Sequence, residues 1–167
     1  METIQFKKIT PDMFPLVFEF MEEHYLPDEP VCRSLGIKRN WMLDEFLWKD
    51  ALKDGSSIAA LDKEGKIIGV RLGQRMKRPS WFSSILDKVS FPLPDWYSTF
   101  DKLMELVGYD VSKMFDQLGT KLIYEDTAVC SARGTGVKGL GTELCRRTEI
   151  LAKELGCTHT YACVTGN

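Results

Sequence analysis

The stretch V-C-S-A-R-G-T-G-V-K-G-L-G-T-E-L, residues Val129–Leu144, decides how the rest of the chain is interpreted. The apolar and β-branched run before it predicts a strand, and residues 143–155 after it predict a helix. Between them lie Arg133 and four glycines. Glycines let the backbone turn sharply, and the free N–H groups of a helix's first turn attract anions. The stretch therefore predicts a phosphate site, with a glycine-rich surface turn that holds no ligand as the alternative.

Length and composition indicate one ordinary domain spanning residues 1–167. The chain is 44% apolar and 28% charged, as soluble globular proteins are. Its net charge is −2 and its basic residues form no run, so we expect no nucleic-acid partner. The N-terminus has no apolar signal segment, and no stretch approaches the roughly 18 apolar residues of a membrane span. We expect a soluble, cytoplasmic protein without a membrane partner.

Five cysteines and two histidines give no metal or disulfide pattern. There is no C-x-x-C pair, and the histidines lie far apart, so no metal site is predicted. The odd number of cysteines argues against a disulfide framework and favours reduced thiols that are buried as small apolar groups. A nucleophilic pair of Cys130 and His159 is compatible with the spacing, which does not otherwise support it.

The remaining chain predicts strands and helices in a definite order. Strands are expected at residues 3–9, 56–61, 66–75 and 158–164, and amphipathic helices at 11–25 and 41–53. A turn at residues 62–65 predicts that the two middle strands pair antiparallel. Pro27 and Pro30 forbid a continuous helix and predict a structured bend between them.

Residues 79–119 form an aromatic-rich insertion with helix-like stretches at 98–107 and 110–118. We expect this insertion either to cover one face of the sheet or to form a wall of a substrate pocket. The complete order is β-α-α-β-β, the helical insertion, then β-α-β. It predicts an α/β fold with a mixed central sheet flanked by helices, in which the last two strands are parallel.

Two nucleotide folds must be weighed, because Gly134, Gly136 and Gly139 satisfy G-x-G-x-x-G. A dinucleotide-binding unit needs an acidic residue at the end of the next strand, and residues 158–164 contain none. A P-loop needs G-K-[ST], whereas Lys138 is followed by glycine and leucine. The context disfavours both folds and leaves a dinucleotide enzyme as a third hypothesis.

Several motifs resemble one known family of enzymes. The D-T-A-V end of the strand (residues 126–129), the R-G-T-G loop and the helix G-T-E-L-C-R-R resemble the GNAT superfamily of N-acetyltransferases. The segment L-P-D-E-P-V-C-R-S-L-G at residues 26–36 and the ending L-G-C-T-H-T-Y-A-C-V-T-G-N resemble insect arylalkylamine (dopamine-type) N-acetyltransferases. The resemblance covers essentially the whole chain. It implies a GNAT-like domain that acetylates a small primary amine, of arylalkylamine or polyamine type, with acetyl-CoA.

The resemblance also implies which residues bind acetyl-CoA. Backbone amides at 127–129 would run alongside the pantetheine arm, and the glycine loop would enclose the pyrophosphate. The family pattern R-x-x-G-x-G/A is met except at Lys138, so residues 138–140 (K-G-L) read as an insertion. The implied cofactor-binding residues are Thr127, Ala128, Val129, Arg133, Gly134, Thr135, Gly136, Val137, Lys138, Gly139, Gly141 and Thr142.

Acetyl transfer from a thioester to an amine needs a neutral amine, a polarised carbonyl and a proton for the leaving thiolate. The resemblance implies that Glu29 is the general base, acting through ordered water, with a solvated turn carboxylate as the alternative. Thr165 matches a hydroxyl residue of the family, as a proton donor or amine contact, or else it caps a turn. Tyr25 and Asp28 are expected to contact the amine, and the acidic groups of Asp28 and Glu29 would favour a cationic substrate. The aromatic residues of the insertion would either stack on an aryl substrate or pack in the core; they are Trp81, Phe82, Trp96 and Tyr97.

The chain departs from the family at its C-terminal end. A further helix and two further strands that follow the last strand in the family are absent from this sequence. We therefore expect an open sheet edge, covered by a second copy of the chain in a homodimer, unless the chain is a fragment or isoform. The alternative function is a CoA-binding or dimerising module without turnover.

Overall fold

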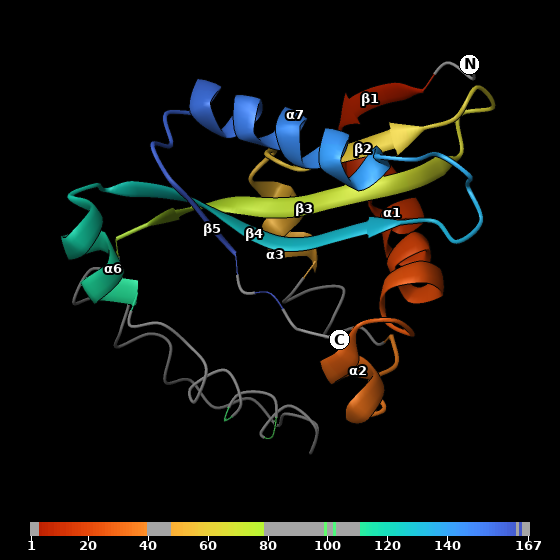
Figure 1. Cartoon of the computed structure of the whole chain (residues 1–167), viewed down its shortest axis with the longest axis horizontal. Coiled ribbons are helices and arrows are strands. Elements are labelled where there is room, and N and C mark those ends of the chain that lie inside the picture. The colour runs from red at the N-terminus through yellow and green to blue at the C-terminus, as the bar shows by residue number, and fades with distance from the viewer. Residues whose placement is uncertain are drawn as a thin grey trace.

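The structure is a computed structural model that describes residues 4–39, 48–78, 99, 102, 111–162 and 164. Its strands form one sheet in the order β1-β2-β3-β4-β5 (Figure 1). The first three pairs are antiparallel, and β4 and β5 are parallel, which confirms the predicted mixed sheet. The strands are β1 Gln5–Lys8, β2 Ile58–Leu61, β3 Ile67–Lys77, β4 Leu122–Ser131 and β5 Thr160–Ala162.

Helices lie on both faces of this sheet. The helices of the described residues are α1 Phe14–Phe20, α2 Pro30–Ser34, α3 Lys49–Lys53, α6 Val111–Leu118 and α7 Leu140–Glu154. A 3-10 turn at Pro11–Met13 precedes α1, and a π-helical turn at Met21–Tyr25 follows it. The proline at the first helical position and the end of the helical run at residue 25 are as predicted.

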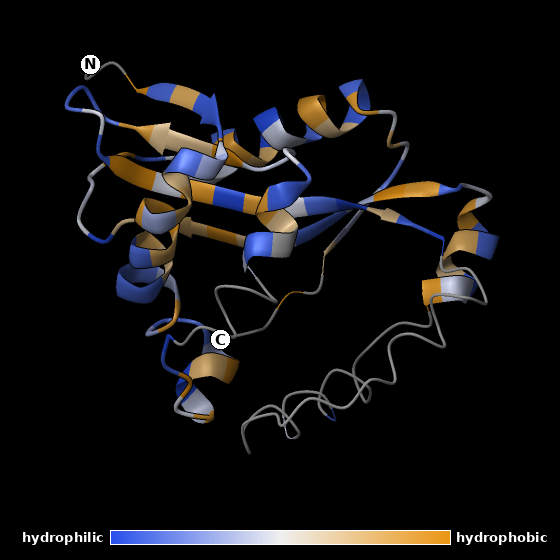
Figure 2. Ribbon diagram, turned by 180° about the vertical axis from the view of Figure 1, so that it is seen from behind, coloured by the Kyte–Doolittle hydropathy of each residue, from blue (hydrophilic) through white to orange (hydrophobic). Residues whose placement is uncertain are grey.

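Two of the apolar clusters hold α1 and α7 to the sheet. On one face, Val17 of α1 and its neighbours pack against Val70 and Leu72 of β3 and Ala128 of β4. On the other face, Leu144 and the rest of the apolar side of α7 pack against β2 and β3. Figures 1 and 2 show α7 and α1 on opposite sides of the central strands, which are largely apolar.

The predicted bend between Pro27 and Pro30 is shorter than expected, because α2 begins at Pro30. A proline suits the first helical position, where its missing N–H would have no partner in the helix. Only the last part of the helix predicted at 41–53 lies among the described residues, as α3. Of the predicted helix at 98–107 only residues 99 and 102 are described, both as helical, and the two interpretations of the insertion lie outside the described residues, whereas α6 confirms the stretch at 110–118.

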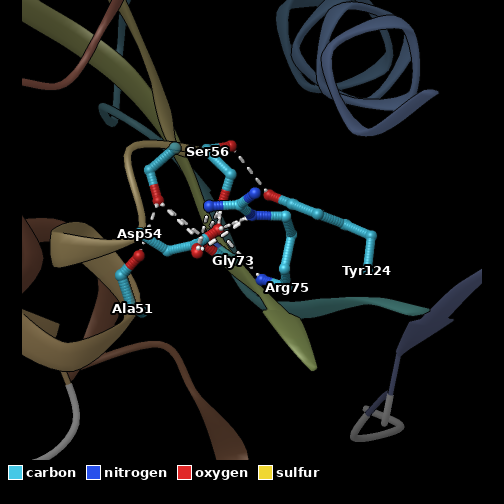
Figure 3. Close-up of polar contacts among 7 residues, drawn as sticks. Ala51, Asp54, Ser56, Gly73, Arg75 and Tyr124 are labelled. Carbon is cyan, nitrogen blue, oxygen red and sulfur yellow. Dashed lines mark hydrogen bonds and ion pairs between the residues drawn. The ribbon is translucent and has the colours of Figure 1, made fainter. Parts of the chain in front are cut away.

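A close approach of two strands explains the glycine at position 73. A Cβ atom there would lie 2.3 Å from the Tyr124 hydroxyl oxygen and 2.5 Å from the Glu125 carbonyl oxygen. The Gly73 carbonyl accepts hydrogen bonds from the hydroxyls of Ser56 and Ser57, and the Tyr124 hydroxyl donates to the Ser56 carbonyl over 3.1 Å (Figure 3). This buried network joins β3, β4 and the segment before β2.

Across the described ranges, no helix is both long enough and apolar enough to cross a bilayer.

Candidate active site

The parallel pair β4 and β5 separates partway along its length. Pairing covers Tyr124 to Asp126 on β4 and Thr160 to Ala162 on β5, whereas β4 continues to Ser131. β5 ends at Ala162, whereas Figure 1 shows β4 continuing past the end of β5. The edge of β4 from Thr127 onward therefore has no β5 partner among the described residues.

A cleft of about 540 Å³ opens where the two strands separate. The π-helical turn, α2, β3, β4, α7 and β5 all contribute to it, which brings residues distant in sequence into one site. Its lining residues are His24, Tyr25, Asp28, Glu29, Pro30, Arg71, Asp126, Thr127, Ala128, Val129, Cys130, Ser131, Cys145, Ala162 and Val164. In the same region the His24 Nδ1 and Thr127 Oγ1 atoms are buried and have no hydrogen-bond partner in the described part of the chain.

Glu29 is held rigidly in the wall of this cleft. It is the N-cap residue of α2, where its carboxylate accepts a hydrogen bond from the Cys32 backbone N–H, and only 9% of the residue is exposed. Burial and a hydrogen bond to Glu29 raise the pKa of the Cys32 thiol to about 12. Burial, together with the nearby Glu29 charge, also raises the pKa of Tyr25, whose ring packs edge-on against Trp48. The alternative of a fully solvated turn carboxylate is therefore wrong for Glu29.

Asp28 and Arg133 form an ion pair across the cleft entrance. Arg133 Nε donates to Asp28 Oδ2 over 2.9 Å, although the two residues are 105 positions apart. The hydrogen bond from Arg133 holds the pKa of the Asp28 carboxyl below its usual range, and the same bond raises the pKa of Arg133. Both side chains remain more than half exposed, so a competing anion has access to the guanidinium.

The glycine loop joins this ion pair to the start of α7. Gly134, Gly136 and Gly139 all have positive φ angles, which residues with side chains rarely adopt. Gly139 is the N-cap of α7, so the N–H groups of residues 140–142 form the first turn of that helix. The predicted strand–loop–helix unit is thus present, with its helix beginning three residues earlier than expected.

A second ion pair lies in the wall of the cleft, beneath α7, and unlike the first it is buried. Arg71 Nε donates to Asp126 Oδ1 over 2.7 Å, Arg71 Nη2 contacts Asp126 Oδ2, and Arg71 Nη1 contacts the Cys145 sulfur. Burial raises the pKa of Asp126, an effect that the bonds to Arg71 partly offset. This pair was not predicted from the sequence, where the signal for it is a charged residue within the otherwise apolar strand I-I-G-V-R-L-G.

The structure brings part of the predicted site together in one cleft, whereas the glycine-loop residues 134–139, 141 and 142 do not line that cleft. Tyr25, Asp28, Glu29 and residues 127–129 line the cleft, and Arg133 lies at its entrance, bonded to Asp28. Thr165 and the aromatic residues of the insertion lie outside the described residues. Of the possible nucleophilic pair of Cys130 and His159, only Cys130 lines the cleft. The backbone carbonyl of His159 instead accepts a hydrogen bond from the Tyr124 N–H, in the stretch where β4 and β5 pair. In the described ranges, no three His, Cys, Asp or Glu side chains are grouped so that they could hold a metal ion.

Comparison with known structures shows which fold this is. The arylalkylamine N-acetyltransferase 2 of Aedes aegypti has a TM-score of 0.87 and 22% identity, with 99% of this chain and 77% of that chain covered. The Drosophila melanogaster polyamine N-acetyltransferase, which catalyses formation of N-acetylagmatine, has a TM-score of 0.80 and 15% identity, covering 99% and 78%. A GNAT family acetyltransferase from Brucella melitensis in complex with acetyl-CoA has a TM-score of 0.56 and 12% identity, covering 100% and 79%.

No family model and no curated protein sequence matches the chain. The structural comparisons nevertheless agree on the fold, since they extend over nearly the whole chain. The chain has the GNAT fold, in the form seen in insect amine N-acetyltransferases.

Proposed function

We propose that this chain transfers the acetyl group of acetyl-CoA to a small primary amine. One observation carries the proposal: the cleft at the separation of β4 and β5 exposes an unpaired strand edge on one side and the Glu29 carboxylate on the other. An extended amide-containing ligand can bind such an edge as a further strand would. The likeness to acetyltransferases of the same fold supports this interpretation.

The residues present offer groups to the pantetheine arm and to the diphosphate of acetyl-CoA. The edge of β4 at residues 127–129 offers backbone groups to the pantetheine arm, and the buried Thr127 hydroxyl still needs a partner. The glycine loop and the first turn of α7 offer N–H groups to a diphosphate. Arg133 would exchange Asp28 for the diphosphate, which carries more negative charge.

Glu29 is the group that we propose removes the proton from the amine. An ammonium ion has no lone pair, so it must lose a proton before it can attack a carbonyl. The N-cap hydrogen bond fixes one carboxylate oxygen of Glu29 at the end of α2, with the side chain at the cleft wall. Acetyl-CoA supplies the activated acetyl group and the leaving thiolate.

The charges around the cleft favour a substrate with one ammonium group and an aromatic part. Asp126 is already paired with Arg71 and is not free to bind an ammonium, whereas Asp28, once Arg133 turns to the diphosphate, can bind the one ammonium of the substrate. Tyr25 provides an aromatic surface at the cleft wall. We therefore propose an arylalkylamine rather than a polyamine as the preferred substrate class.

An assay of CoA thiol release with a panel of amines tests this proposal. We expect turnover with the wild-type chain and a loss of about 10²–10⁴-fold in kcat for Glu29→Gln, which keeps an oxygen to cap α2. The matched control is Glu64→Gln, an exposed acid in the turn between β2 and β3. Acetyl-CoA binding without turnover would favour the alternative, a CoA-binding module, and absence of binding would contradict both.

A further inference from the structure

The buried pair of Arg71 and Asp126 plays no part in the chemistry proposed above. Each side chain is only 10% exposed, and two hydrogen bonds join the guanidinium to the carboxylate. Removing two charges from water costs so much that well-packed apolar residues are often equally stable in such a place. Stability alone therefore does not account for the pair.

The pair lies at an irregularity in β4. Leu72 pairs with Ala128, but the next residue of β3, Gly73, pairs with Asp126, so Thr127 is an extra residue in the strand. Such a bulge leaves the backbone groups of the extra residue outside the ladder. At this point the cleft is lined by Thr127, whose hydroxyl oxygen is buried and has no partner within the described ranges.

The bulge reverses the alternation of side chains along β4. Before it, Asp126 lies on the α7 face, where Arg71 also contacts Cys145 of α7. After it, Ala128 and Cys130 lie on the opposite face, in the apolar cluster that contains α1. If β4 had no bulge while Ala128 and Cys130 stayed in the cluster with α1, the side chain of Asp126 would lie on that same face, away from α7 and Arg71.

That change would leave two buried charges without partners. Asp126 would enter an apolar cluster, and Arg71 would remain beneath α7. Breaking a buried ion pair in this way is much more costly than replacing the whole pair by apolar residues. The Arg71–Asp126 pair therefore penalises any register of β4 other than the one observed.

We propose that Arg71 and Asp126 are positioning residues, which fix the bulge at Thr127 and thereby hold the strand edge at 127–129 against the ligand. The statement about the ligand rests on the proposed function, but the statement about the bulge does not. Neither residue needs to touch the reacting atoms for this role. The pair acts through the backbone of β4.

The double variant Arg71→Met/Asp126→Leu tests the proposal, because it removes both charges and keeps similar volumes. The matched control is Asp54→Asn/Arg75→Met, which removes another ion pair of β3 outside the cleft. Hydrogen exchange of residues 125–131, thermal unfolding, acetyl-CoA binding and kcat are measured on both. The variant Arg71→Lys, which keeps a pair of opposite charges, provides a partial rescue.

For the first double variant we expect an unfolding temperature near that of the wild type and exchange at 125–131 that is faster by about tenfold. We expect kcat to fall by about tenfold to a hundredfold, because small misplacements of reacting groups are costly. The control should keep wild-type exchange at 125–131, and Arg71→Lys should lie in between.

Wild-type exchange at 125–131 in the Arg71→Met/Asp126→Leu variant would overturn the proposal. So would failure of that variant to fold, since the pair would then be needed for stability itself. If the wild-type chain binds no acetyl-CoA, the proposed function fails, and the exchange experiment alone decides the role of the pair.

Discussion

Replacing Gly73 by alanine should destabilise the fold strongly, because the new methyl group has no space. The added Cβ would lie 2.3 Å from the Tyr124 hydroxyl oxygen, 2.5 Å from its Cζ atom and 2.5 Å from the Glu125 carbonyl oxygen. The carbonyl belongs to the neighbouring strand and cannot move without disturbing the ladder between β3 and β4. The tyrosine ring is fully buried and has little freedom to rotate away.

The magnitude follows from two contributions. Overpacking of a well-packed interior costs about 1–3 kcal/mol. Displacing the Tyr124 hydroxyl from the Ser56 carbonyl leaves a buried donor without its partner, at about 1–3 kcal/mol more. A loss of about 4 kcal/mol in the free energy of unfolding corresponds to a decrease in Tm of about 8–16 °C for a domain of this size.

Thermal and urea unfolding followed by circular dichroism measure this change. Gly141→Ala is the matched control, because a Cβ there meets nothing within 4 Å and the residue is in α7. Alanine should stabilise that helix by about 0.5–1 kcal/mol. The same substitution should therefore raise the free energy of unfolding at position 141 and lower it at position 73. In Gly73→Ala/Tyr124→Phe only the contact with the hydroxyl is relieved, and recovery should be partial. A change of less than about 0.5 kcal/mol for Gly73→Ala would refute the reasoning.

Three further predictions concern pH, thiols and the cleft entrance. Burial opposes ionisation of Asp54, but hydrogen bonds from Arg75 and Ser56 outweigh it and lower the pKa of Asp54 below its usual value. The ionised Asp54 therefore stabilises the folded state above about pH 4, and this stabilisation is lost as the pH falls further. The difference in Tm between wild type and Asp54→Asn should be constant near neutral pH and shrink below about pH 4, and a difference that grows on acidification would contradict this. Burial raises the pKa values of Cys32 and Cys130 to about 12. Iodoacetamide should therefore modify these thiols far more slowly than a free thiol at about pH 8, as measured by mass spectrometry. Fast labelling would show that the cleft wall opens. Arg133→Ala should leave Tm unchanged and raise the KM for acetyl-CoA by about tenfold, less at high salt, and an unchanged KM would exclude a role in diphosphate binding.

Most of the sheet was predictable because its strands carry their own local signals. β2 and β3 are apolar runs joined by a turn, and the glycine loop marks the passage from β4 to α7. α2 was missed because its first residue is a proline, which suits both the start of a helix and a bend. The short length of α2 gives no periodicity to detect.

Contacts between distant residues explain what the sequence did not reveal. The resemblance of the segment at residues 26–36 suggested Glu29, but the burial of this residue depends on the packing of the π-helical turn and β4 around it. The Arg71–Asp126 pair depends on the bulge. In a regular strand Asp126 would lie on the same face as residues 128 and 130, whereas the bulge puts it on the opposite face. Neither the bulge nor the separation of β4 and β5 has a local sequence signature.

A crystal structure of the chain with acetyl-CoA tests the central claim most directly. The account predicts the diphosphate against Arg133 and the first turn of α7, the pantetheine arm along residues 127–129, and the thioester within reach of Glu29, directly or through one water molecule. Acetyl-CoA bound elsewhere, or a thioester on the far side of β4 from Glu29, would contradict it.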